Sequence, residues 1–192
     1  MLCWLAACVQ PIQPTPTPAP TAIASPTPPA PPPTGPTFPP DTVGTFLAVN
    51  YGASPSDLTL FTQFSVGPDE IMGYRYTDAT GQTCAGFAQA AANPPTVWNA
   101  DFRCSPPGTQ LTAGSTLFAL TNGEFYVVAF GYVDPNTAPN ANAYAVTFPN
   151  GDALTNLLTN NGFVALRPGL DLPTQVNIIT PEGNTVLTAP LQ

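Results

Sequence analysis

The segment NGEFYVVAFGYV, residues 122–133, carries the strongest structural signal in the chain. From Phe125 to Phe130 every side chain is aromatic or aliphatic, and side chains alternate between the two faces of a strand. A strand that is apolar on both faces is covered on both, so we expect a central strand between two layers. The Asn122-Gly123 pair before it predicts a tight type I′ hairpin, because both residues of that turn must accept positive φ.

Short apolar or alternating runs, separated by Asn-Gly and Pro turns, continue on both sides of this segment. Helix signals are weak: the best helical candidate, Cys84–Ala92, lacks the charges of helix ends and is followed by Pro94-Pro95. We predict strands at Gly44–Val49, Leu58–Val66, Ile71–Thr77, Gln82–Gln89, Val97–Cys104, Thr116–Leu120, Glu124–Val133, Ala143–Phe148, a run ending near Leu158, Phe163–Arg167, Val176–Thr180 and Thr185–Leu187. Strands about every ten residues favour an all-β antiparallel sandwich, with a β-barrel as the alternative.

Two strand registers are predicted from the alternation of side chains. Tyr144, Val146 and Phe148 should share one face of their strand, and Phe163, Ala165 and Arg167 one face of theirs. Arg167 at the strand end is interpreted as a surface ion-pair partner. The turn spacing from Tyr132 to Leu187 resembles hairpin modules common in exported bacterial β-sandwich domains, a resemblance that brings no catalytic motif.

At the other end of the chain, Leu5-Ala6-Ala7-Cys8 resembles the lipobox of bacterial lipoproteins. The resemblance implies that Cys8 becomes the lipidated N-terminus and that residues 1–8 are a signal peptide. The apolar run before Cys8 is shorter than usual and has no basic residue in front of it, which we interpret as a truncated signal peptide whose start codon lies upstream of Met1. The alternative is an apolar N-terminus with an incidental cysteine.

Residues 9–43 are predicted to be a disordered Pro/Thr-rich linker. Pro11 to Pro40 holds 14 of the 27 prolines, and proline fixes φ and lacks the amide hydrogen that a helix or sheet needs. Polyproline II rises about 3.1 Å per residue, so such a segment spans on the order of 90 Å and acts as a semi-rigid spacer. Residues 44–192 are then long enough for a single all-β domain.

The charge balance excludes several classes of function. The chain has 11 acidic residues, three arginines, no lysine and no histidine, with a net charge of −8. Such a surface repels phosphate backbones, which argues against nucleic-acid binding. Without histidine, neither a Ser-His-Asp nor a Cys-His arrangement forms within this chain. We expect no cofactor.

Cys84 and Cys104 are an even pair in the predicted domain, about twenty residues apart, outside a CxxC motif and without histidine. That pattern is a poor metal site and predicts a disulfide, which favours an oxidising compartment. Two buried free thiols are the alternative.

Three further sets of residues are candidates for a site. Glycosidase chemistry needs two carboxyl groups, and candidates are Asp69, Glu70, Asp101, Glu124 and Asp152, although no spacing selects a pair, so we assign no catalytic residue. Asp134, Asn136 and Asn140 offer closely spaced oxygen ligands for calcium, without the Gly and terminal Glu of an EF-hand loop. Tyr74, Tyr76 and Trp98 are candidates for stacking on a sugar ring or a partner, with burial in a core as the alternative.

The sequence therefore predicts an exported lipoprotein, held at the bacterial cell surface membrane by a lipid on Cys8. Its domain is expected to be a non-enzymatic interaction or structural module that contacts a cell-envelope protein or glycan. A secreted carboxylate-dependent glycoside hydrolase and a carbohydrate-binding module are the alternatives.

Overall fold

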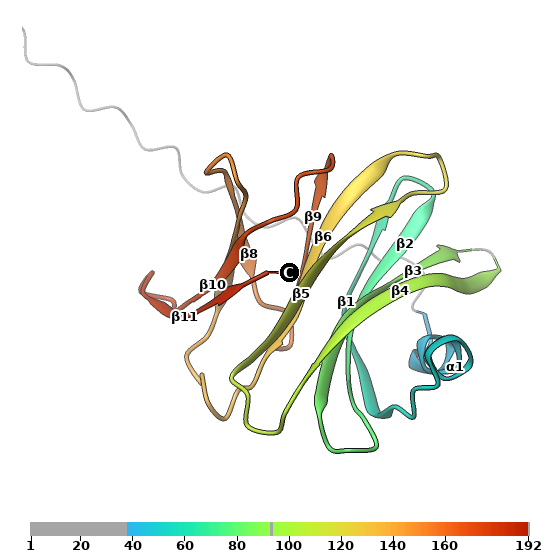
Figure 1. The fold of residues 1–192 in the computed structure, drawn as a ribbon, viewed down its shortest axis with the longest axis horizontal. Coiled ribbons are helices and arrows are strands. Elements are labelled where there is room, and N and C mark those ends of the chain that lie inside the picture. The colour runs from blue at the N-terminus through green and yellow to red at the C-terminus, as the bar shows by residue number, and fades with distance from the viewer. Residues whose placement is uncertain (1–37, 93, 192) are drawn as a thin grey trace, which may run out of the picture. The chain divides into compact units, whose positions relative to one another are not determined.

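The computed structural model describes residues 38–92 and 94–191 (Figure 1). One helix precedes a succession of antiparallel strands. The helix is α1 (Pro40–Tyr51), and the strands are β1 (Ser56–Val66), β2 (Asp69–Thr77), β3 (Thr83–Ala92), β4 (Pro95–Ser105), β5 (Leu111–Ala119), β6 (Phe125–Val133), β7 (Ala143–Thr147), β8 (Ala153–Leu157), β9 (Gly162–Pro168), β10 (Gln175–Ile179) and β11 (Thr185–Pro190).

The strands form three sheets, which we call the N-terminal sheet (β1-β2-β3-β4), the middle sheet (β5-β6-β9) and the C-terminal sheet (β11-β10-β7-β8). The middle sheet lies between the other two, and α1 covers the outer face of the N-terminal sheet (Figure 1). A separate apolar cluster fills each of the three spaces between neighbouring layers. The predicted all-β antiparallel sandwich is confirmed, and none of these sheets closes into a barrel.

Strand β6 has the central position that its sequence predicts. Val128 and Phe130 pack in the cluster against the N-terminal sheet, whereas Val127 and Ala129 pack in the cluster against the C-terminal sheet. All four side chains are at most 2% exposed. Burying a large apolar side chain contributes about 1.5–3 kcal/mol, so this strand stabilises two layers at once.

The prediction of a strand at Gly44–Val49 is wrong, because these residues belong to α1. Pro40 lies at the first helical position, Asp41 in the first turn, and Gly52 ends the helix with φ +64°. These are the start and stop residues that helices prefer. The predicted linker boundary at residue 43 is also wrong, since Phe38 and Val43 are buried in the core.

The predicted type I′ turn at Asn122-Gly123 is replaced by a different hairpin. Only Gly123 has positive φ, and its N–H donates to the Leu120 carbonyl while the Leu120 N–H donates to Glu124. This is a three-residue loop with glycine in the left-handed region. A two-residue turn with both residues at positive φ occurs instead at Asn160-Asn161.

Cys84 and Cys104 form the predicted disulfide. They lie directly opposite each other in the pairing of β3 with β4. The chain-entropy model assigns about 3 kcal/mol of stability to closing a loop of this order of length.

Both predicted registers are confirmed. Tyr144, Val146 and Phe148 are all buried in the cluster between the middle and C-terminal sheets. Phe163 and Ala165 face the same cluster, and the Arg167 guanidinium lies 4.3 Å from the centre of the Phe148 ring. Arg167 also pairs with Asp152 at 3.1 Å, as expected for a surface ion pair.

Candidate functional site

Asp69 is a buried carboxyl group with a structural role, because both of its oxygens already accept hydrogen bonds. One of its oxygens accepts hydrogen bonds from the Thr121 N–H at 2.7 Å and the Gln89 side-chain amide at 3.3 Å, and the other accepts from the Thr121 hydroxyl. Gln89 also donates to the Ala119 carbonyl at 2.9 Å. Asp69 is 1% exposed and Gln89 is fully buried, so this network joins the N-terminal sheet to the β5–β6 turn.

The other candidate carboxylates lie in different parts of the domain. Glu70 accepts a hydrogen bond from the Ser65 hydroxyl, and Asp101 pairs with Arg103 at 2.8 Å. Asp152 pairs with Arg167, and Glu124 is exposed in the β5–β6 turn. Neither of the two hollows described below is lined by any of the five candidate acids.

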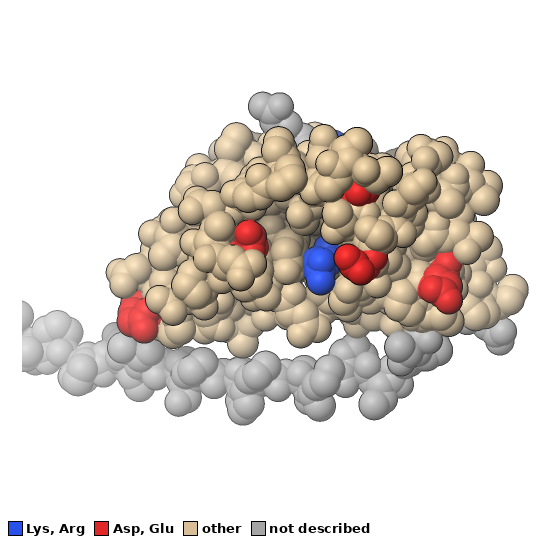
Figure 2. Space-filling model, turned by 90° about the horizontal axis from the view of Figure 1, so that it is seen from below, with Lys and Arg blue, Asp and Glu red and all other residues tan. Residues whose placement is uncertain are grey.

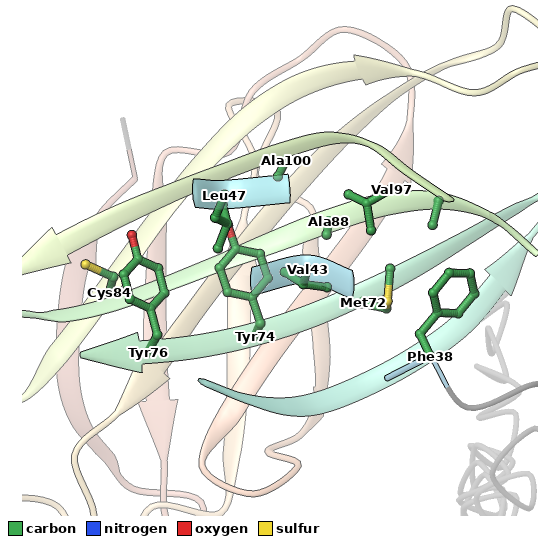
Figure 3. Close-up of a cluster of buried hydrophobic side chains, with 11 residues drawn as sticks. Phe38, Val43, Leu47, Met72, Tyr74, Tyr76, Cys84, Ala88, Val97 and Ala100 are labelled. Atoms are coloured by element: carbon green, nitrogen blue, oxygen red, sulfur yellow. The ribbon is translucent and has the colours of Figure 1, made fainter. Parts of the chain in front are cut away.

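The predicted aromatic binding set is not an exposed strip. Tyr74 and Tyr76 are at most 1% exposed, and their rings stack 6.2 Å apart beneath α1 (Figure 3). Burial raises the pKa of Tyr74 well above its ordinary value and that of Tyr76 to about 12. Trp98 is 42% exposed but lies at an irregularity of β4, where the β3–β4 register skips it. Of the two alternatives, burial in a core is therefore the one found for Tyr74 and Tyr76, because the helix covers them.

The predicted calcium ligands do not converge. The Asn136 N–H and side-chain amide both donate to one oxygen of Asp134, at 2.9 and 3.0 Å, so Asn136 faces Asp134 as a donor. Asn140 lines a separate hollow beside Ala141 and Val186. Within residues 38–92 and 94–191, the one close group of acidic and cysteine ligands is Asp78 with the disulfide sulfurs of Cys84 and Cys104, which are not free thiolates.

Two of the predicted features concern membrane attachment. Cys8 and the rest of the predicted signal peptide lie outside the described residues. In the described part of the chain, no helix has both the length and the apolar character needed to cross a membrane.

A groove of about 380 Å³ lies at the side of the sandwich where β9 and β8 are the edge strands of their sheets. We call it the edge groove. It is lined by Thr62, Phe64, Tyr144, residues 154–157, Thr159 and residues 162–166. None of these side chains is charged. Leu154 and Leu157 of β8 are 37% and 54% exposed, so the groove has apolar groups at its rim.

The register shows which backbone groups of β9 point into this groove. The Gly169 N–H donates to the Phe125 carbonyl and the Val133 N–H to the Asn161 carbonyl, so the odd-numbered residues of β9 bond to β6. The backbone N–H and C=O groups of the even-numbered residues therefore point to the free edge, because the direction of these groups alternates along an antiparallel strand. Gly162 is paired there with Thr159, and the Tyr144 hydroxyl donates to the Val164 carbonyl at 3.2 Å.

A second hollow, of about 340 Å³, opens between the N-terminal and middle sheets; we call it the arginine cleft. It is lined by Arg75, Thr83, Gly108, Thr109, Thr112, Tyr132, Asp134, Pro135 and Asn136. The arginine cleft lies at the end of the sandwich that carries the β2–β3, β4–β5 and β6–β7 connections, which is the lower end in Figure 1. Figure 2 views the molecule from that end. In this view, the basic surface forms a small patch beside acidic side chains, and uncharged surface surrounds both (Figure 2).

Comparison of the chain with protein-family models, with curated proteins and with solved structures finds no match in any of the three. What the domain can bind is therefore judged from the groups that line its hollows. Sequence reasoning names Asp134 and Asn136, but as calcium ligands, and it misses Arg75 and Tyr132. Arg75 is one of three basic residues in the chain, and that rarity is the signal that could have drawn attention to it.

Proposed function

We propose that this protein is a lipid-anchored, extracytoplasmic binding protein whose domain takes up an extended polypeptide segment in the edge groove. The anchor is supported by the Leu5-Ala6-Ala7-Cys8 motif and the Pro/Thr-rich tract behind it. The Cys84–Cys104 disulfide supports an oxidising compartment. The module is non-enzymatic in this proposal, and its partner is a cell-envelope protein.

The observation that carries the proposal is the set of unpaired backbone groups on β9. The N–H of Val164 and both the N–H and C=O of Leu166 point to the free edge, without a partner among the described residues. These outward groups recur at every second residue of β9. An added β-strand forms its hydrogen bonds at this same spacing. An extended backbone is therefore the chemistry that fits this edge.

The walls of the groove indicate which segments would fit. Thr62 and Phe64 come from the N-terminal sheet, whereas Leu154 and Leu157 come from the C-terminal sheet. Side chains of an added strand alternate between these two walls. Because no charged side chain lines the groove, the segment that it accepts is uncharged at the inserted positions.

Replacing Leu166 tests the proposal. Leu166→Pro removes the outward N–H but leaves the bonds to β6, and Pro168 already occupies an equivalent edge position. Leu166→Ala is the matched control, since it shortens the same side chain and keeps the N–H. Nine-residue peptides are selected from a displayed library on the full chain, and their affinities for the three proteins are measured.

We expect peptides that bind wild type and Leu166→Ala similarly and bind Leu166→Pro about tenfold more weakly, since a lost hydrogen bond with a desolvated partner costs about 1–3 kcal/mol. The same peptides should slow hydrogen exchange at the Val164 and Leu166 amides of wild type. Equal binding to Leu166→Pro, unchanged exchange, or failure to select any peptide would overturn the proposal. Self-association that Leu166→Pro abolishes, without peptide binding, would instead make a second copy the occupant.

The anchor has a separate test. Expression of the protein from its natural gene should give membrane-bound protein whose N-terminal peptide carries lipid on Cys8, detected by mass spectrometry. Cys8→Ser should release the protein from the membrane fraction. An unmodified Cys8 in membrane-bound wild type would exclude lipid anchoring, whatever the peptide measurements show.

A further inference from the structure

Arg75 differs from the other two arginines of the chain in its partners. Arg103 and Arg167 each pair with a carboxylate, at 2.8 and 3.1 Å. Arg75 has no ion pair or hydrogen bond from its guanidinium to another described residue, and its contact is with the Tyr132 ring, whose centre is 5.2 Å from the guanidinium carbon. The half-buried guanidinium thus keeps its donors free, while stacking holds it in place.

Other polar groups around Arg75 are also unused. Thr112 is 2% exposed, and its hydroxyl, like that of Thr83, has no hydrogen-bond partner among the described residues. Asp134 uses one carboxyl oxygen for Asn136, which leaves the other oxygen free to accept. The cleft therefore presents a planar cationic donor, hydroxyls and a free carboxylate oxygen around one space.

We propose that the arginine cleft binds an acidic sugar, a ring that carries one carboxylate and several hydroxyl groups. The carboxylate accepts paired hydrogen bonds from the Arg75 guanidinium, whose planar fork matches carboxylate geometry. Ring hydroxyls donate to the free oxygen of Asp134 and exchange hydrogen bonds with Thr83 and Thr112. The volume of about 340 Å³ is in the range of small-molecule sites.

The surrounding charges select among anionic ligands. Asp134 lies in the same cleft and the chain has a net charge of −8, so a phosphate group with two charges is repelled more than a single carboxylate. A simple carboxylate without hydroxyls leaves Asp134 and the threonine hydroxyls unsatisfied. An uncharged sugar leaves Arg75 unsatisfied. A uronic acid satisfies both kinds of group.

Titration of the full chain with sodium D-glucuronate tests the proposal, with D-glucose and sodium acetate as matched ligands that each lack one of the two features. Binding is followed by calorimetry and by NMR shifts of the Thr112 and Tyr132 amides. Glucuronate should bind at least about tenfold more tightly than either control ligand, because the carboxylate pair and the hydroxyl contacts act together.

Variants separate Arg75 from the other arginines. Arg75→Gln should weaken glucuronate binding about tenfold or more, and Arg75→Lys severalfold, since lysine keeps the charge and loses the planar fork. Arg167→Gln removes an ion-paired arginine elsewhere and should leave the affinity within about twofold. The NMR shifts in wild type keep the test decisive if an Arg75 variant does not fold.

Equal binding of glucose or acetate, glucuronate shifts that miss Thr112 and Tyr132, or unchanged affinity in folded Arg75→Gln would each overturn the proposal. Its failure is distinguishable from failure of the peptide proposal. Leu166→Pro lies in the edge groove and should leave glucuronate binding unchanged, and Arg75→Gln should leave peptide binding unchanged.

Discussion

Removing the Asp69 carboxyl group should destabilise the fold strongly, although an acid beside a turn would ordinarily be replaceable. Asp69→Ala deletes the acceptor for the Thr121 N–H and for one hydrogen of the Gln89 amide. Gln89 is fully buried between the N-terminal and middle sheets, whereas Thr121 is exposed in the β5–β6 turn, where water can replace the acceptor that its N–H loses.

The expected magnitude follows from the buried Gln89 donor. A buried donor left without an acceptor costs about 1–3 kcal/mol, so the free energy of unfolding should fall by about that amount. For a domain of this size, each 1 kcal/mol lowers Tm by about 2–4 °C. Asp69→Asn keeps the volume and one acceptor oxygen, so it should lose less stability than Asp69→Ala.

Urea denaturation followed by far-UV circular dichroism, with the disulfide intact, measures the loss. Glu124→Ala is the control, because it removes one acidic side chain from the exposed β5–β6 turn and should change stability by about 0.5 kcal/mol or less. If Asp69→Ala lost no more stability than Glu124→Ala, the network would not be a structural link between the two sheets.

Two further predictions concern packing and pH. An added Cβ at Gly162 would lie 2.3 Å from the Phe61 ring, so Gly162→Ala should lower the free energy of unfolding by about 1–3 kcal/mol. In α1, an added Cβ at Gly44 meets nothing closer than 3.9 Å, so Gly44→Ala should raise the free energy of unfolding by about 0.5–1 kcal/mol. Loss of stability in both variants by urea denaturation would contradict this reasoning. Burial raises the pKa of Tyr144 to about 12, so the folded state holds that proton more tightly than the unfolded state does. The contribution of Tyr144 to the free energy of unfolding is complete below pH 10, and up to about 3 kcal/mol is lost as the pH rises toward 12. Tyr144→Phe should therefore show a shallower fall in stability over that pH range. An identical slope in the two proteins would refute the assignment.

Local sequence patterns were sufficient for the fold class and for the faces of individual strands. The alternation in β7 and β9 predicted which residues share a face, and the doubly apolar β6 predicted its central position, because both follow from the two-residue period of a strand. The spacing of Cys84 and Cys104 predicted their disulfide. For α1 the start and stop residues are present in the sequence, but its short apolar run also fits a strand.

What covers a strand face is not a local property, and only the tertiary structure decided it. Tyr74 and Tyr76 share a face of β2, and α1 buries that face, so they are core residues rather than a binding strip. In the same way, the partners of Asp69 come from β3 and the β5–β6 turn, whereas Arg75 contacts the Tyr132 ring and pairs with no carboxylate of the described residues. Whether a polar side chain is structural or free to bind depends on residues that lie far away in the chain, and pairing of the layers brings those residues together.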